Sequence, residues 1–112
     1  MKIAIVGSRG FRRLWKVNAY ISELPKDAII VSGGAYGVDA LAVAAGRRYG
    51  LAVIEILPDW EKFGKAAGMM RNSDIVAQCD RLVAFWDGMS RGTKDSIDKA
   101  RKAGKRVEII TA

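Results

Sequence analysis

The chain has 112 residues, half of them hydrophobic, and a formal net charge of +7. This length and composition are typical of one globular domain, and we expect residues 1–112 to form it around a single core. A lone cysteine, Cys79, excludes an internal disulfide, and the absence of histidine disfavours a transition-metal site. The absence of histidine also excludes catalysis by serine–histidine or cysteine–histidine pairs.

The charge balance and the amino terminus indicate partners and location. The positive charge favours an anionic partner, either a nucleic acid or a phosphorylated small molecule, and a basic surface without a specific partner is the alternative. No apolar stretch approaches the roughly 18 residues that span a bilayer. The start MKIAIVGSRG lacks the layout of a signal peptide. We therefore expect a cytoplasmic protein with no membrane partner, which also fits a single cysteine in a reducing compartment.

The first half of the chain alternates between strand and helix signals. Residues 2–6 form a β-branched run that ends at a glycine, which predicts a buried strand. Apolar residues at helical spacing predict a helix over 14–24, which Pro25 ends. A second apolar run predicts a strand over 28–31, and a second helix is expected over 38–49.

The second half continues the alternation. A strand is expected over 51–57, a helix over 68–78 and a strand over 82–86. Apolar residues at helical spacing predict a helix over 93–103, and an apolar run predicts a last strand over 107–110.

A polar loop containing Trp60 and Phe63 is expected between the third strand and the third helix. Packing of this loop onto the domain is the favoured interpretation of its aromatic residues, and stacking on a nucleobase is the alternative.

Near-continuous apolar strands separated by helices favour a parallel sheet that is covered on both faces. With right-handed connections this becomes a doubly wound, Rossmann-like α/β domain with about five mainly parallel strands. Ligands of such folds bind at the carboxyl ends of the strands. The loops at that edge are therefore the place to look for a site.

These loops are rich in glycine, hydroxyl and basic residues. Glycines let backbone amide groups approach a phosphate closely. The N-terminus of the helix that follows such a loop adds its positive dipole, and arginine side chains bind phosphate through two hydrogen bonds. Neither a Walker A motif nor a complete G-x-G-x-x-G is present, and no cofactor or metal is implied. The candidate ligand-binding residues are Gly7, Ser8, Arg9, Ser32, Gly33, Gly34, Gly37, Asp39, Arg71, Asn72, Ser90, Arg91, Gly92 and Thr93.

Within this set the roles differ. The arginines are candidate charge partners, and the hydroxyls of Ser8, Ser32 and Thr93 are candidate hydrogen-bonding groups. Asp39 either caps the second helix or binds a sugar hydroxyl. Gly7 together with Ser8 is equally consistent with a tight strand–helix turn.

Five motifs follow one another along the chain: G-S-R at 7–9, S-G-G-A-x-G-V-D at 32–39, G-K-A-A-G at 64–68, R-N at 71–72 and S-x-G-T at 90–93. Together they resemble the small YspA-like branch of the SLOG superfamily, a Rossmann-like group that includes the Smf/DprA DNA-processing proteins and the LOG phosphoribohydrolases. The resemblance spans nearly the whole chain. It implies a nucleotide or nucleotide-derived ligand at the glycine loops, often in a sensing role, and LOG-type relatives imply a possible homo-oligomer.

The resemblance also bears on catalysis. LOG enzymes carry G-T-x-x-E, whose glutamate serves the glycosidic chemistry, whereas Ser96 stands at that place here. Serine is no carboxylate base, and a helical step of about 100° turns Asp95 away. The leading hypothesis is therefore a nucleotide-binding, sensing domain without a complete catalytic constellation. The alternatives are a nucleotide-processing enzyme that uses Asp39 or Asp87 on an N-glycosidic or phosphate bond, and a DNA-binding module of Smf/DprA type.

Overall fold

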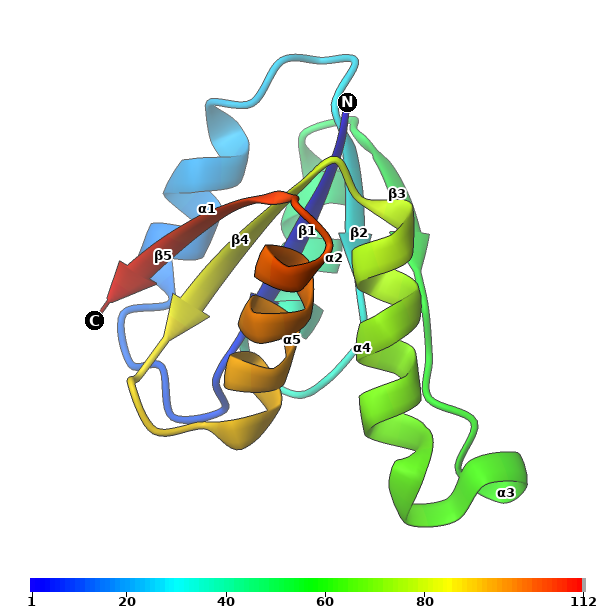
Figure 1. Cartoon of the computed structure of the whole chain (residues 1–112). Coiled ribbons are helices and arrows are strands. Elements are labelled where there is room, and N and C mark those ends of the chain that lie inside the picture. The colour runs from blue at the N-terminus through cyan, green and yellow to red at the C-terminus, as the bar shows by residue number, and fades with distance from the viewer. Residues whose placement is uncertain (112) are drawn as a thin grey trace.

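The computed structural model describes residues 1–111, and Ala112, the last residue of the predicted domain, lies outside that range. A five-stranded sheet in the order β3-β2-β1-β4-β5 forms the centre of the fold (Figure 1). All neighbouring strands run parallel. The strands are β1 (Lys2–Gly7), β2 (Ile29–Ser32), β3 (Ala52–Glu55), β4 (Arg81–Trp86) and β5 (Arg106–Thr111).

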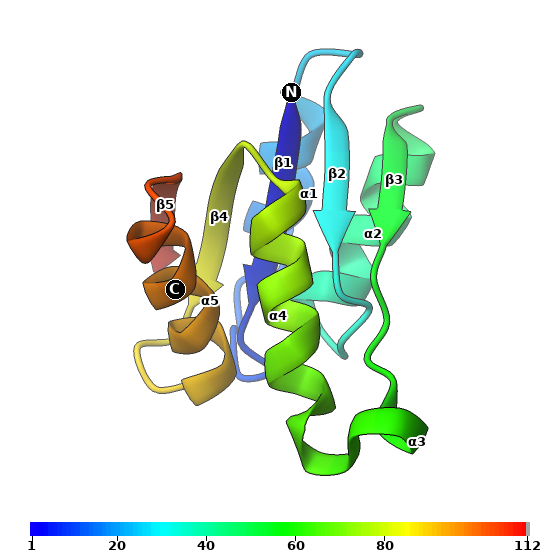
Figure 2. The same ribbon diagram turned by 45° about the vertical axis from the view of Figure 1, so that its right-hand side comes forward.

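Helices cover both faces of the sheet, as Figure 2 shows. α1 and α2 pack together on one face, and α4 and α5 pack together on the other. The predicted doubly wound, Rossmann-like α/β fold is thus confirmed. The helical elements are α1 (Trp15–Ser22), α2 (Val38–Arg48), α3 (Trp60–Phe63), the 3₁₀ turn η1 (Gly64–Ala66), α4 (Ala67–Gln78) and α5 (Arg91–Lys102).

The sheet separates two hydrophobic clusters. Successive side chains of a strand point to opposite faces, so Ile5 of β1 joins the cluster under α1 and α2, whereas Val6 joins the one under α4 and α5. Phe85 of β4 is fully buried in the first cluster, where its ring meets those of Phe11 and Tyr20 edge to face, with centroids 5.6 and 6.0 Å apart. Burial on both faces explains the continuous apolar runs of β1 and β4.

The segment between β3 and α4 differs from the predicted loop. The Asp59 side chain accepts a hydrogen bond from the backbone N–H of Lys62 at 3.0 Å and caps the short helix α3. Gly64 then takes a positive φ of 54°, and η1 leads directly into α4. Figure 1 shows α3 beyond the carboxyl ends of the strands. Within residues 1–111, no helix has the length and apolar character needed to cross a membrane.

Candidate ligand-binding site

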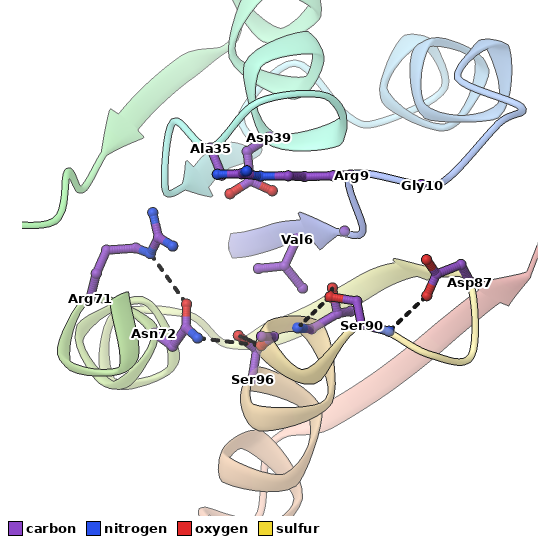
Figure 3. A pocket seen from close by; sticks show the side chains of 13 residues that line it. Val6, Arg9, Gly10, Ala35, Asp39, Arg71, Asn72, Asp87, Ser90 and Ser96 are labelled. Atoms are coloured by element: carbon purple, nitrogen blue, oxygen red, sulfur yellow. Dashed lines mark hydrogen bonds between the residues drawn. The ribbon is translucent and has the colours of Figure 1, made fainter. Parts of the chain in front are cut away.

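A pocket of about 300 Å³ lies at the carboxyl ends of β1 and β4 (Figure 3). The chain leaves β1 toward β2 on one side, while β4 lies on the other side of β1, and ligands of doubly wound sheets bind at such a switch point. The first turns of α2 and α5 flank the pocket from opposite faces of the sheet. Its lining consists of Val6, Gly7, Arg9, Gly10, Ala35, Asp39, Arg71, Asn72, Asp87, Ser90, Gly92, Thr93 and Ser96.

Glycines bring the start of α2 against the end of β1. A Cβ atom at Gly7 would lie 2.6 Å from the side chain of Val38, so only glycine leaves room for this contact. Gly37 precedes α2 with a φ of 89°, a left-handed conformation that favours glycine. The close packing sets the first turn of α2, including Asp39, at the pocket. Asp39 is therefore a residue of the first turn and not the helix cap.

Burial governs the charge of Asp39, whose residue surface is only 5% exposed. Loss of solvation raises the pKa of this carboxyl group from 3.8 to about 6. The nearby charge of Arg71 and the backbone amides of Ala35, Gly33 and Gly7 act in the opposite direction and limit the rise of this pKa. At neutral pH the carboxylate is mainly ionised and able to accept a hydrogen bond from a ligand hydroxyl.

A hydrogen-bonded turn holds the opposite wall. The Oδ1 atom of Asp87 accepts the backbone N–H groups of Met89 and Ser90, both at 2.9 Å, and these bonds lower the pKa of Asp87. Ser90 caps α5, because its Oγ accepts the backbone N–H of Thr93 at 3.4 Å. Ser8 joins the same network, since its Oγ accepts the backbone N–H of Asp87 at 3.2 Å. The N-terminus of α5 is thereby fixed at the pocket.

Two residues of α4 connect the walls. The Nη1 atom of Arg71 donates to the carbonyl oxygen of Gly33 at 2.8 Å, and its Nε donates to Oδ1 of Asn72 at 3.2 Å. The Nδ2 atom of Asn72 donates in turn to the carbonyl oxygen of Gly92 at 3.3 Å and to Oδ2 of Asp95 at 3.2 Å. This chain of bonds runs from the β2–α2 loop through α4 to α5. It presets the position of the Arg71 guanidinium.

Ser96 is almost completely buried and lines the pocket, and its Oγ donates to the carbonyl oxygen of Gly92 at 3.4 Å. Asp95 is outside the lining and forms an ion pair with Lys99 at 2.9 Å. The wall of the pocket therefore contains the Ser96 hydroxyl, at the place in the sequence to which the G-T-x-x-E pattern assigns a glutamate. The carboxylates that line it are those of Asp39 and Asp87.

The structure brings most of the predicted ligand-binding residues together. Those that line the pocket are Gly7, Arg9, Asp39, Arg71, Asn72, Ser90, Gly92 and Thr93. Gly33 and Gly34 line an adjoining groove instead.

The remaining candidates lie outside both linings. Ser32 is completely buried, and its hydroxyl donates to the carbonyl oxygen of Ile5 at 2.9 Å. Ser8 is buried behind the pocket wall, Gly37 serves the backbone turn, and Arg91 is an exposed first residue of α5.

The pocket is also lined by five residues that were not among the candidate ligand-binding residues: Val6, Gly10, Ala35, Asp87 and Ser96. Ala35 lies inside the S-G-G-A-x-G-V-D motif, so that motif could have identified it as a site residue. Val6 could have been identified by its position at the end of a predicted strand. Across residues 1–111, no three histidine, cysteine, aspartate or glutamate side chains gather in a group suited to a metal ion.

The adjoining groove has a volume of about 480 Å³ and lies between the β2–α2 loop and the segment that follows β3. It shares Arg9, Ala35 and Arg71 with the pocket. Its full lining is Arg9, Gly33, Gly34, Ala35, Tyr36, Leu57, Pro58, Trp60 and Arg71.

Solved structures show where this fold occurs. DprA from Streptococcus pneumoniae superposes with a TM-score of 0.87 at 22% identity, over 99% of this chain and 50% of that chain. DprA from Helicobacter pylori, whose structure concerns its single-stranded DNA binding mode, gives a TM-score of 0.67 at 21% identity, over 97% and 64% of the two chains. At these identities the likeness shows the fold, and this chain spans about half to two thirds of the DprA chains.

Sequence comparison gives the family. The Gene 61 protein of Mycobacterium phage D29 is 37% identical over 113 residues, which cover 92% of this chain and 90% of that protein. The model of the YspA, cpYpsA-related SLOG family matches residues 1–63, more than half of the chain. The motifs of the β1 and β2 loops, which supply Gly7, Arg9 and Asp39 to the pocket, fall within that match. The chain therefore belongs to the YspA, cpYpsA-related SLOG family.

Proposed function

We propose that the chain is a ligand-binding domain that senses a nucleotide or a nucleotide-derived phosphate ester in the pocket at the ends of β1 and β4. The observation that carries the proposal is the chemistry of this pocket. Two helix N-termini and the guanidinium groups of Arg9 and Arg71 supply positive potential, while hydroxyl groups and one buried carboxylate supply hydrogen-bonding partners. Phosphate and sugar hydroxyls together match this set.

The two sides of the pocket suit different parts of such a ligand. Ser90, Gly92 and Thr93 at the first turn of α5 offer a helix dipole and hydroxyl groups, which favour a phosphate. Asp39 on the α2 side is buried and ionised at neutral pH, so it repels a phosphate and accepts a hydrogen bond from a ribose hydroxyl. The carboxylate of Asp87 on the α5 side is exposed to solvent, and its Oδ1 is already bound by two backbone N–H groups, so it opposes a phosphate less. We therefore assign the phosphate to the α5 side and the ribose to the Asp39 side.

Arg9 offers a direct test of the proposal, because its side chain is exposed and the three ion pairs within residues 1–111 do not include it. Its removal should leave folding intact. We expect AMP to raise the melting temperature of the wild-type protein, since a ligand of the native state adds RT ln(1 + [L]/Kd) to its stability. Arg9→Ala should weaken AMP binding about tenfold in isothermal titration calorimetry, through loss of a charge-assisted contact.

Arg12→Ala is the matched control, because Arg12 is an exposed arginine of the same loop that lies outside the pocket lining. It should bind AMP as the wild type does. The proposal is wrong if neither AMP nor ribose 5-phosphate at millimolar concentration shifts the melting temperature, or if the two arginine variants weaken binding equally.

Single-stranded DNA is the second candidate ligand. The net charge of +7 and the DNA-binding mode reported for the Helicobacter pylori DprA favour it. Two of the five basic side chains of α5 are paired within the helix, however, because Lys94 pairs with Asp98 at 3.0 Å and Lys99 pairs with Asp95 at 2.9 Å. This local neutralisation is the reason for ranking the nucleotide first.

Fluorescence anisotropy with a short oligothymidylate distinguishes the two candidates. A DNA-binding module should bind it at physiological salt, with an affinity that falls steeply as salt increases. Charge reversal at Arg101 and Lys102, which are exposed on α5, should then weaken the binding of the oligonucleotide and leave the affinity for AMP unchanged.

A further inference from the structure

The groove beside the pocket carries two exposed aromatic rings from separate loops. Tyr36 of the β2–α2 loop is 81% exposed and Trp60, the first residue of α3, is 59% exposed. The exposed side chain of Leu57 lines the groove with them. Large apolar side chains gathered at one exposed concave surface are typical of a binding surface rather than of ordinary solvent contact.

The groove is continuous with the pocket. Arg9, Ala35 and Arg71 line both, so they form the border between the phosphate-binding region and the aromatic region. Arg71 is held at this border by its hydrogen bonds to the carbonyl oxygen of Gly33 and to Asn72. Guanidinium groups stack on the flat faces of nucleobases as aromatic side chains do, so the border itself suits a base.

Glycine backbone forms the side of the groove nearest the β2 strand. A Cβ atom at Gly33 would lie 2.7 Å from Cδ of Arg71, and one at Gly34 would lie 2.6 Å from Cδ2 of Leu57. Gly34 also has a φ of 69°, which other residues rarely adopt. The positive φ favours glycine at position 34, and a side chain at position 33 would displace the Arg71 side chain. The two glycines thus let the side chains of Arg71 and Leu57 lie close against the backbone of this loop.

Trp60 lies near the start of α4 although most of its surface is exposed. The cap that Asp59 provides fixes the first turn of α3, and Cη2 of Trp60 lies 3.7 Å from the position of a Cβ atom at Gly68 in α4. One edge of the ring thus faces the start of α4, and a methyl group at position 68 would touch it. An aromatic side chain that is oriented before binding loses less conformational freedom when a ligand stacks on it.

We propose that this groove is a nucleobase subsite, in which the base of a purine nucleotide stacks on Trp60 and Tyr36 beyond the Arg9–Arg71 border. The inference rests on the proposed function, because the phosphate and ribose of the same nucleotide occupy the pocket. Asp39 lies on the side of the pocket next to Ala35, so a ribose bound there directs its base toward the groove (Figure 3). A purine is favoured over a pyrimidine because its larger ring system offers more stacking surface.

Calorimetric titration of AMP and of ribose 5-phosphate, which lacks the base, tests the subsite. The wild type should bind AMP more tightly than ribose 5-phosphate. Trp60→Ala and Tyr36→Ala should each weaken AMP about 5- to 150-fold, the range expected for one lost stacking contact. Neither should change the affinity for ribose 5-phosphate, and Trp60→Phe should retain most of the affinity for AMP.

Trp15→Ala is the matched control, because Trp15 is 64% exposed on α1 and lies outside the groove. It should bind both compounds as the wild type does. Equal affinity of the wild type for AMP and ribose 5-phosphate, with AMP unaffected by Trp60→Ala, overturns the base subsite and leaves the proposed function standing.

The remaining outcomes are interpreted as follows. If neither compound binds, the proposed function fails and the subsite fails with it. If Trp60→Ala weakens both compounds equally, the change has disturbed more than a stacking contact, and Tyr36→Ala then decides. Tyr36 is so exposed that its truncation should leave the fold intact. Wild-type affinity of Tyr36→Ala for AMP would refute the subsite.

Discussion

Replacing Asp39 with asparagine removes a carboxylate that the fold keeps away from water. Burial raises the pKa of Asp39 from 3.8 to about 6. The folded state therefore binds the proton more tightly than the unfolded state does, so protonation of Asp39 favours folding. Its contribution to stability is complete below about pH 4 and is lost as the pH rises through about 6.

The pKa difference sets the size of the effect. At 1.36 kcal/mol per pKa unit, the difference between 3.8 and about 6 corresponds to about 3 kcal/mol of unfolding free energy. Asp39→Asn, which cannot ionise, should therefore be more stable than the wild type by up to about 3 kcal/mol above pH 7. Below pH 4 the two proteins should have nearly equal stability.

Urea unfolding at one-unit steps from pH 4 to pH 8 measures this difference. The change in unfolding free energy between the two proteins isolates Asp39, because the other titrating groups contribute equally to both. A difference that stays constant over this range would refute the assignment of the pKa rise to burial. Lower stability of Asp39→Asn at pH 8 would show that attraction to Arg71 outweighs the loss of solvation.

Four further variants probe the packing and the turns around the site. Gly7→Ala should lose about 1–3 kcal/mol in urea unfolding, because its Cβ meets the side chain of Val38 at 2.6 Å. Gly68→Ala, whose Cβ makes only an ordinary contact at 3.7 Å, should be neutral or gain up to about 1 kcal/mol by the same measurement. Phe85→Ala should cost about 3–5 kcal/mol by removing a fully buried ring, and an unchanged urea midpoint would contradict the described core. Asp87→Ala should lower the melting temperature at pH 7, and the deficit should shrink as the pH falls below about 4, because the pKa of Asp87 is lowered in the folded state and its stabilisation is lost on protonation.

The sheet and its helices could be predicted because burial of the sheet on both faces requires apolar residues along whole strands. β1 and β4 are continuous apolar runs, and the helices between strands show clear apolar spacing. α3 was missed because four residues are too few to show a helical period. Its cap depends on the contact between Asp59 and the backbone of Lys62, which residue types alone do not reveal.

Side-chain direction limited the prediction of the site. Ser32 lies in a glycine-rich motif, yet its hydroxyl turns toward the carbonyl oxygen of Ile5 on the neighbouring strand. Inside a predicted helix the direction could be worked out: Ser96 lines the pocket, whereas Asp95, one residue earlier, turns to Asn72 and Lys99, as a helical step of about 100° implies. For Trp60, the sequence favoured packing of its loop, and the structure leaves most of the ring exposed.

The sheet separates the helices into two layers, but the walls of the pocket come from both of them. Asp39 belongs to the α1–α2 layer, and Asn72 and Ser96 belong to the α4–α5 layer. A ligand that contacts both walls would act as a non-covalent cross-link between the layers, so either layer could open locally only after the ligand dissociates. Occupancy of a small pocket would then appear as slower amide exchange in helices on opposite sides of the molecule.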